Sequence, residues 1–199
     1  MTSNGLFKRF DRAAVTQLAA SRATEQRTVR KELADQFPAL DPYWEAILPK
    51  KQDIMLVHTG DNVVLVALVP EKGLTEGVSI LFFRHHDGPY LPSLRLLHQY
   101  PIMMTHLTHR VDIGGCKFVV SGSNVMCPGL TSPGGSVGPG IPRGAPVAIY
   151  IEGKKHAVAV GITLMSSDEI VKINKGHCIE NVHHLGDGLW RTPVLAHTV

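Results

Sequence analysis

Two runs of β-branched and apolar residues stand almost side by side in the second half of this sequence, and they limit the folds open to it. The runs are APVAIYIEG and KHAVAVGITLM, and a Gly–Lys pair lies between them. Runs of this composition are typical of β-strands, and glycine permits the turn that joins them. The sequence therefore predicts a β-hairpin between residues 145 and 165.

Further short elements are predicted around this hairpin. SSDEIVKINKG is typical of a helix, because Ser166 and Glu169 can form a capping box and Lys175–Gly176 can mark its end. HCIENVHHL is predicted to be the last strand, GDG a turn, and Trp190 a core residue. NVMCPGL resembles a strand that is interrupted at Pro128–Gly129. Many short strands with one or two short helices, over about 80 residues, are typical of a small β-barrel.

The run VDIGGCKFVVSG admits two alternatives. Asp112 can cap a short helix, and Gly122 can supply the left-handed residue that ends it. Phe118, Val119 and Val120 favour a strand instead. The local pattern leaves both alternatives open.

The first half of the chain begins with helical patterns. TEQRTVRKELADQF places Val29, Leu33 and Phe37 on one apolar stripe, and Pro38 is expected to end this helix. DPYWEAIL predicts a second, short helix. In that helix Asp41 would be the N-cap and Pro42 the first helical residue.

Three apolar runs follow these helices and predict strands: DIMLVHT, NVVLVALV and VSILFFRHH. The charged, glycine-containing segment at residues 70–78 is expected to be a protruding loop between two of them. LPSLRLLHQY then predicts a helix that Pro92 opens. The sequence thus predicts an α+β fold, with an N-terminal α+β domain (residues 1–107) that holds helices, a small antiparallel sheet and a helix. A mixed β-barrel (residues 108–199) would follow.

Composition and charge exclude several classes of protein. The chain has 199 residues, 44% of them hydrophobic, and three widely spaced cysteines without a CxxC pair. This argues against a disulfide framework, and no apolar run reaches the roughly 20 residues of a membrane span. A reduced, cytoplasmic protein is expected. The net charge is +3, but residues 1–31 carry seven basic and two acidic residues, which either solubilise the segment or contact phosphates.

Eleven histidines raise the question of a metal site. The local clusters are His85–His86, His106 with His109, and His183–His184, and none has the spacing of a known zinc motif. Paired histidines on strands would also point to opposite faces. No metal or other cofactor is therefore predicted.

The sequence gives little indication of a catalytic or nucleotide-binding site either. The segment SGSNVMCPGLTSPGG contains no GxSxG elbow and no phosphate loop, and Cys127 is expected to be a small buried residue. A binding surface remains, where Gly122 and Gly129 would permit positive φ angles and a close approach of the backbone. Basic residues could surround it: Lys154, Lys155, Lys172, Lys175 and Arg191.

The runs SGSNVMCPGL, VAIYIEGKKHAVAVGI and SSDEIVKINKGHCIENVHHLGDGLW resemble the PUA domain, a small RNA-binding barrel. Its Gly-x-x-Val-x-x-Pro-Gly pattern falls on Gly122, Val125, Pro128 and Gly129. In that family a helix precedes the first glycine, which by analogy favours a helix at residues 112–121.

The first half narrows the resemblance. LFKRFD, ADQFPALDPYWEAILPKK and LFFRHHDGPYLPSLRLLHQYP, together with MCPGLTSPGG, resemble the malignant T-cell-amplified sequence family. The resemblance implies a non-catalytic translation factor in the cytoplasm. Its partners would be density-regulated protein, the RNA of the small ribosomal subunit and the acceptor end of tRNA, in recycling of deacylated tRNA, reinitiation and unconventional initiation. The candidate RNA-binding residues are Gly122, Asn124, Met126, Pro128, Gly129, Lys117, Lys154, Lys155, Lys175 and Arg191.

Two other classes of function are considered beside this one. An RNA-modification enzyme, or an accessory subunit of one, would need catalytic residues in the first domain, where Asp53, Asp61 and Asp87 are the candidates. A protein-interaction adaptor would use the loop at residues 70–78 with Tyr43 and Trp44, although Trp44 is expected to lie in the core.

Overall fold

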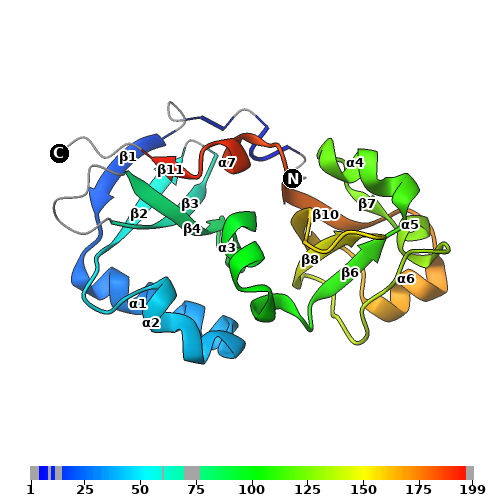
Figure 1. Ribbon diagram of the computed structural model, residues 1–199, viewed down its shortest axis with the longest axis horizontal. Coiled ribbons are helices and arrows are strands. Elements are labelled where there is room, and N and C mark those ends of the chain that lie inside the picture. Colours follow the sequence, from blue (N-terminus) through cyan, green and yellow to red (C-terminus); the bar gives the residue numbers. More distant parts are fainter. Residues whose placement is uncertain (1–4, 9, 12–14, 60, 70–76, 196–199) are drawn as a thin grey trace. The chain divides into compact units, whose positions relative to one another are not determined.

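The computed structural model describes residues 5–8, 10–11, 15–59, 61–69 and 77–195. These residues form two units, each traced in Figure 1. The N-terminal unit comprises Phe10–Met103 with Thr192–Val199, and the C-terminal unit comprises Met1–Arg9 with Met104–Arg191. Within the described ranges, no helix combines the length and the apolar character needed to cross a membrane. The predicted boundary between residues 107 and 108 remains a prediction.

The N-terminal unit contains an antiparallel sheet in the order β1-β2-β3-β4-β11, with β5 also paired to β4. Its strands are β1 (Val15–Ala20), β2 (Ile54–Thr59), β3 (Val63–Leu68), β4 (Val78–His85), β5 (Leu91–Pro92) and β11 (Val194–Leu195). The predicted small antiparallel sheet is confirmed. The expectation that helices come first is wrong, because β1 precedes them. VTQLAA has only moderate strand propensity, and its pairing with β2 decides its conformation.

Helices cover one face of this sheet. The unit contains α1 (Ala23–Gln36), η2 (Pro38–Tyr43), α2 (Trp44–Ile47), α3 (Leu94–Gln99) and all but the last residue of η3 (Pro101–Met104). Phe82 of β4 contacts both Phe37 and Trp44, with ring centroids 5.6 and 6.2 Å apart, so α1 and α2 pack on the face that carries Phe82. The predicted stripe of Val29, Leu33 and Phe37 is buried, as expected.

Two predicted helix starts are wrong. Asp41 caps no helix, because the 3₁₀ segment η2 already begins at Pro38 and contains Pro42 in its interior. Proline suits the first turn of a helix, and here Pro38, not Pro42, occupies that position. Pro92 does not open α3 either, because it pairs with β4 as part of β5, and the hydroxyl of Ser93 caps the helix instead.

The C-terminal unit contains a second sheet in the order β6-β8-β9-β10-β7, in which β6 and β8 are parallel and the other pairs antiparallel. Its strands are β6 (Thr108–Val111), β7 (Val125–Met126), β8 (Pro146–Ile151), β9 (Ala159–Thr163) and β10 (His177–His184). Its helices are η4 (Ile113–Gly115), α4 (Cys116–Val120), α5 (Cys127–Thr131), α6 (Ser167–Ile173) and α7 (Gly188–Arg191). The predicted hairpin is β8–β9, and the mixed barrel-like sheet is confirmed.

Several details of the C-terminal prediction change. The segment after Asp112 is helical, as the resemblance implied. Residues Cys127–Thr131 form α5 and not a strand, because proline at the second position suits the first helical turn. The capping box of Ser166 and Glu169 is confirmed, but α6 ends one residue earlier than predicted, at a left-handed Asn174. β10 is not the last strand, since β11 follows it.

The core of the C-terminal unit lies between this sheet and its short helices. It includes Val147, Ile149 and Ile151 of β8, each fully buried, together with the thiols of Cys127 and Cys178. Burial raises the pKa of the Cys178 thiol, with a further contribution from nearby Cys127. The prediction that Cys127 is a small buried residue is confirmed. Trp190 is only half-buried, so Leu189 beside it is the deeper residue.

Candidate functional site

An apolar groove of about 470 Å³ lies in the C-terminal unit, among η4, α4 and the β7–α5 segment. Val111, Val119 and Val125 line its base, and Phe118 and Met126 line it while remaining 54% and 50% exposed. Neighbouring Ile113 is 59% exposed. Large apolar side chains exposed together in this way are typical of a binding surface.

Asp112 fixes the helical side of the groove. Its carboxylate accepts a hydrogen bond from the backbone N–H of Gly115 at 2.8 Å and thereby caps η4. A Cβ atom on Gly115 would lie 2.3 Å from Cγ1 of Val111, so no other residue fits there without a shift. The cap and this close approach hold the start of α4 against β6.

The β7–α5 segment forms the other side. Met126 pairs with His177 of β10, and the N–H of Cys127 donates to the carbonyl of Gly176 at 3.0 Å. Gly129, which would permit a positive φ angle, does not adopt one, because it lies inside α5. Its lack of a side chain serves close packing instead, since a Cβ atom would lie 3.3 Å from Val111 Cγ1.

The loop between α4 and β7 is held by two asparagines. Asn124 Oδ1 accepts from the N–H of Asn181 at 3.1 Å, and Asn181 Nδ2 donates to the carbonyls of Val119 and Ser123 at 2.8 and 3.1 Å. Gly122 has the expected positive φ angle, +87°, but does not line the groove. Asn124 thus lines the groove and also holds the loop between α4 and β7 against β10.

The predicted basic residues lie in three different places. Lys117 lies on α4 with its Nζ 5.0 Å from the Phe118 ring centroid, and the carbonyl of Lys175 accepts from the Cys127 thiol at 3.4 Å. Lys117 therefore lies beside a residue that lines the groove, whereas the backbone of Lys175 contacts Cys127, which stands between the lining residues Met126 and Pro128. Arg191 lies in α7, beyond the end of β10 opposite to His177, so it does not belong to this group.

Lys154 and Lys155 are exposed at the β8–β9 turn. Glu152, two residues before Lys154, accepts from the N–H of Ile113 at 3.2 Å. The beginning of this turn therefore lies against η4, on the helical side of the groove.

Within the described ranges, no three His, Cys, Asp or Glu side chains gather in a way that could hold a metal ion. His85 and His86 were expected to point to opposite faces, which is wrong. Their ring centroids are 4.2 Å apart, because His86 has a φ angle of +51° and has left the strand.

The side chains of His183 and Asp187 are buried and in contact, with His183 Nδ1 2.7 Å from Asp187 Oδ2. Burial by itself raises the pKa of Asp187, but the hydrogen bond and charge of His183 and two backbone N–H groups outweigh it, so the pKa is lowered. These contacts fix the turn from β10 into α7.

The three carboxylates considered for catalysis do not form one site. Asp53 precedes β2 and Asp61 follows it, so a whole strand separates them. Asp53 also accepts a hydrogen bond from Gln26 at 3.2 Å.

Of the loop that a protein-interaction adaptor would use, at residues 70–78, residues 70–76 lie outside the described residues. Tyr43 is 41% exposed, and Trp44 is only half-buried, in contact with Phe82.

Sequence reasoning missed several of the residues that line the groove, among them Phe118 and His177. Phe118 was read only as a strand-forming residue. Its neighbour Val119 is 2% exposed, so a helical reading would have placed Val119 inside and Phe118 outside. His177 gave no signal, because only the pairing of β10 with β7 brings it to the groove.

Comparison with known proteins identifies the class of protein. Residues 109–185 match the PUA domain, and residues 8–101 match the Pre-PUA-like domain. A hypothetical protein of Pyrococcus horikoshii has a similar fold, with a TM-score of 0.67 at 19% sequence identity over 89% of this chain and 99% of that one. The chain is therefore a PUA-domain protein with a pre-PUA domain before it.

Relatives of nearly equal length identify the family. Malignant T-cell-amplified sequence 1-A of Xenopus laevis is 42% identical over 93% of this chain and 97% of its own. Translation machinery-associated protein 20 of Saccharomyces cerevisiae is 39% identical over 95% and 99%. The chain belongs to the malignant T-cell-amplified sequence family, as the resemblance indicated.

Proposed function

We propose that this protein is an RNA-binding factor of the translation machinery, and that the groove of its PUA domain holds an unpaired end of an RNA. The observation that carries the proposal is the exposed apolar surface of Phe118 and Met126, with Lys117 beside the Phe118 ring. Single-stranded RNA binds through bases that stack on exposed side chains and through cations near its phosphates.

The parts of the groove have separate tasks in this proposal. A base lies on Phe118 and Met126. Lys117 and Lys175 contact the phosphates on either side, and Lys154 and Lys155 contact the RNA further along. Arg191 is proposed only as a more distant contact, outside the groove.

The partners proposed are those of the family. They are density-regulated protein, the RNA of the small ribosomal subunit, and the acceptor end of a deacylated tRNA during recycling and reinitiation in the cytoplasm. The name of the yeast relative, translation machinery-associated protein 20, supports a place in translation. The proposed role is binding, without a covalent step.

Binding of a fluorescently labelled tRNA acceptor-stem RNA with a single-stranded 3′ end tests the proposal. Phe118→Ala should weaken binding about tenfold, because a stacked base contributes roughly 1–3 kcal/mol. Charge reversal of Lys154, Lys155 and Lys175 together should weaken binding further and reduce its dependence on salt.

Ile173→Ala provides a matched control, because Ile173 is also exposed, at 52%, but does not line the groove. Unchanged affinity in Phe118→Ala would refute the stacking site. Unchanged affinity in the triple lysine variant would refute the basic contacts.

A further inference from the structure

The start of η4, where Asp112 and Gly115 line the groove of the PUA domain, is unfavourable for a phosphate. The free N–H groups at the start of a helix normally attract phosphate groups. Here the N–H of Ile113 donates to Glu152 at 3.2 Å, and the N–H of Gly115 donates to Asp112 at 2.8 Å. Two carboxylates therefore occupy donors that a phosphate would use, and their negative charges repel it.

One oxygen of Asp112 is still free to accept a hydrogen bond. Oδ1 accepts from Gly115, whereas Oδ2 has no donor among the described residues. Oδ2 lies toward α5, on the other side of the groove, because a Cβ atom on Gly129 would be 3.9 Å from it. An ionised carboxylate only accepts hydrogen bonds, so the group that binds Oδ2 must be a donor without negative charge.

The helical side of the groove carries its positive charge elsewhere. Lys117 follows five residues after Asp112, in α4, and its Nζ lies 5.0 Å from the Phe118 ring centroid. An RNA that binds along this side would place phosphates near Lys117 and an uncharged part at Asp112. The last ribose of a free 3′ end is such a part, because its 2′- and 3′-hydroxyls are donors, and carboxylates bind ribose hydroxyls in other nucleotide sites.

We propose that Asp112 selects RNA with a free 3′ end: its carboxylate accepts hydrogen bonds from the terminal 2′- and 3′-hydroxyls and repels an end that carries a 3′-phosphate. The inference rests on the proposed function, since it names the kind of RNA end that the same groove holds. The linking phosphate of the last nucleotide lies on the 5′ side of its ribose, away from these hydroxyls. The repulsion therefore acts above all on a terminal phosphate.

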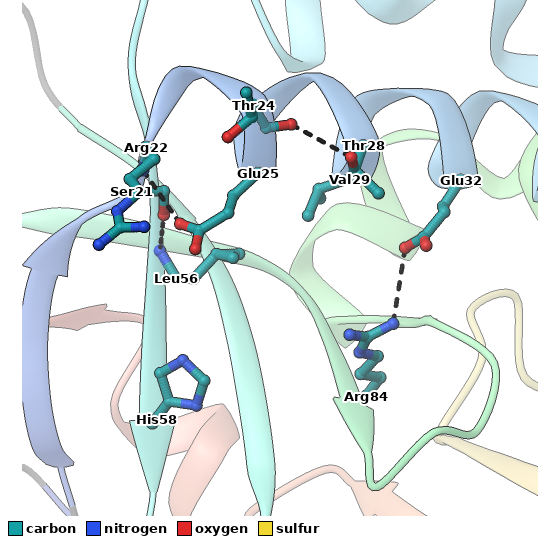
Figure 2. A pocket seen from close by; sticks show the side chains of 10 residues that line it. All are labelled: Ser21, Arg22, Thr24, Glu25, Thr28, Val29, Glu32, Leu56, His58 and Arg84. Carbon is teal, nitrogen blue, oxygen red and sulfur yellow. Dashed lines mark hydrogen bonds and ion pairs between the residues drawn. The ribbon is translucent and has the colours of Figure 1, made fainter.

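A second groove, of about 730 Å³, provides a matched carboxylate in the N-terminal unit, between α1 and the strands β2 and β4 (Figure 2). Arg22 and Arg84 line it together with Glu25 and Glu32, so positive and negative charges are balanced there. Glu25 resembles Asp112 in its local role, because it accepts from the backbone N–H of Arg22 at 3.0 Å at the start of α1.

Fluorescence anisotropy of the full chain tests the inference with two acceptor-stem RNAs that carry a label at the 5′ end and differ only in a 3′-hydroxyl or a 3′-phosphate end. The phosphate RNA should bind about tenfold more weakly, because its added charge lies beside Asp112. In Asp112→Asn this difference should shrink to about twofold or less, because the amide keeps the capping oxygen without the charge. The variant should bind the hydroxyl RNA only slightly more weakly than the wild type, since a neutral oxygen accepts weaker hydrogen bonds than a carboxylate.

Glu25→Gln is the matched control, because it removes the same charge from a carboxylate at a helix start in the other unit. This variant should keep the full difference between the two RNAs. Equal binding of both RNAs by the wild type, or an undiminished difference in Asp112→Asn, would overturn the inference and leave the proposed function standing. No binding of either RNA would contradict the proposed function itself, and this inference with it.

Discussion

At the scale of the residue, His109 shows how burial removes a side chain from the list of candidate ligands. It is 2% exposed, and its Nδ1 accepts from the N–H of Gly138 at 3.1 Å. That nitrogen is therefore occupied, and the other, Nε2, is buried without a partner among the described residues. Burial lowers the pKa of His109 from 6.5 to about 4, so the ring is neutral near pH 7.

This shift predicts a pH dependence of stability. The unfolded chain binds a proton at His109 below about pH 6.5, whereas the folded chain binds it only near pH 4. The stabilisation is complete above pH 6.5 and is lost as the pH falls toward 4. Between pH 7 and pH 5, the free energy of unfolding should fall by about 2 kcal/mol from this group, measured by urea unfolding.

His109→Gln isolates the effect, because glutamine does not titrate and its side-chain oxygen can still accept from Gly138. The variant should lose this part of the pH dependence. An identical pH profile in both proteins would show that His109 is not the group responsible.

At the scale of the element, the short segment η4–α4 depends on its first residue. Neither helix exceeds five residues, so propensity alone cannot hold them, and the cap from Asp112 supplies a partner for a free N–H group. The same segment carries Phe118, so its stability and the shape of the groove are linked.

Asp112→Ala should lower the free energy of unfolding by about 1 kcal/mol, because the cap is lost. It should also weaken RNA binding, because the start of α4 is no longer held in place. Asp112→Asn retains the capping oxygen and should restore most of both properties. Urea unfolding and the RNA-binding titration measure the two effects, and a deficit in the asparagine variant as large as that in the alanine variant would contradict capping as the cause.

At the scale of the whole molecule, each unit takes a short segment from the far end of the chain. The side chain of Phe7 is 2% exposed, and its ring centroid lies 5.8 Å from that of His183. The backbone carbonyl of Phe7 accepts a hydrogen bond from the N–H of Gly188 at 2.8 Å. In the N-terminal unit, Val194 and Leu195 pair with β4. Neither unit is therefore complete as one continuous stretch of sequence.

Phe7→Ala should destabilise the C-terminal unit by about 3 kcal/mol, the usual effect of removing a buried aromatic ring. The chain has two tryptophans, Trp44 in the N-terminal unit and Trp190 in the C-terminal unit. In a Trp44→Phe background, Trp190 fluorescence reports on the C-terminal unit alone. An unchanged unfolding midpoint in that background would show that Phe7 contributes nothing to this unit.

The sequence by itself determined the elements whose local pattern agrees with their final environment. The stripe of Val29, Leu33 and Phe37, the hairpin β8–β9, and the capping box of Ser166 and Glu169 were all predicted. In each, apolar periodicity or a side-chain cap acts within a few residues, so no distant contact is needed. The family resemblance also follows from the sequence, because its motifs cover almost the whole chain.

Only the tertiary structure decided the features that depend on contacts between distant residues. β1 and β11 are strands because β2 and β4 offer backbone partners, and their own residues give weak signals. His177 reaches the first groove through pairing with β7, and Arg84 faces Glu32 across 52 residues of sequence. Such contacts are set by how strands align and helices pack, which no local pattern encodes.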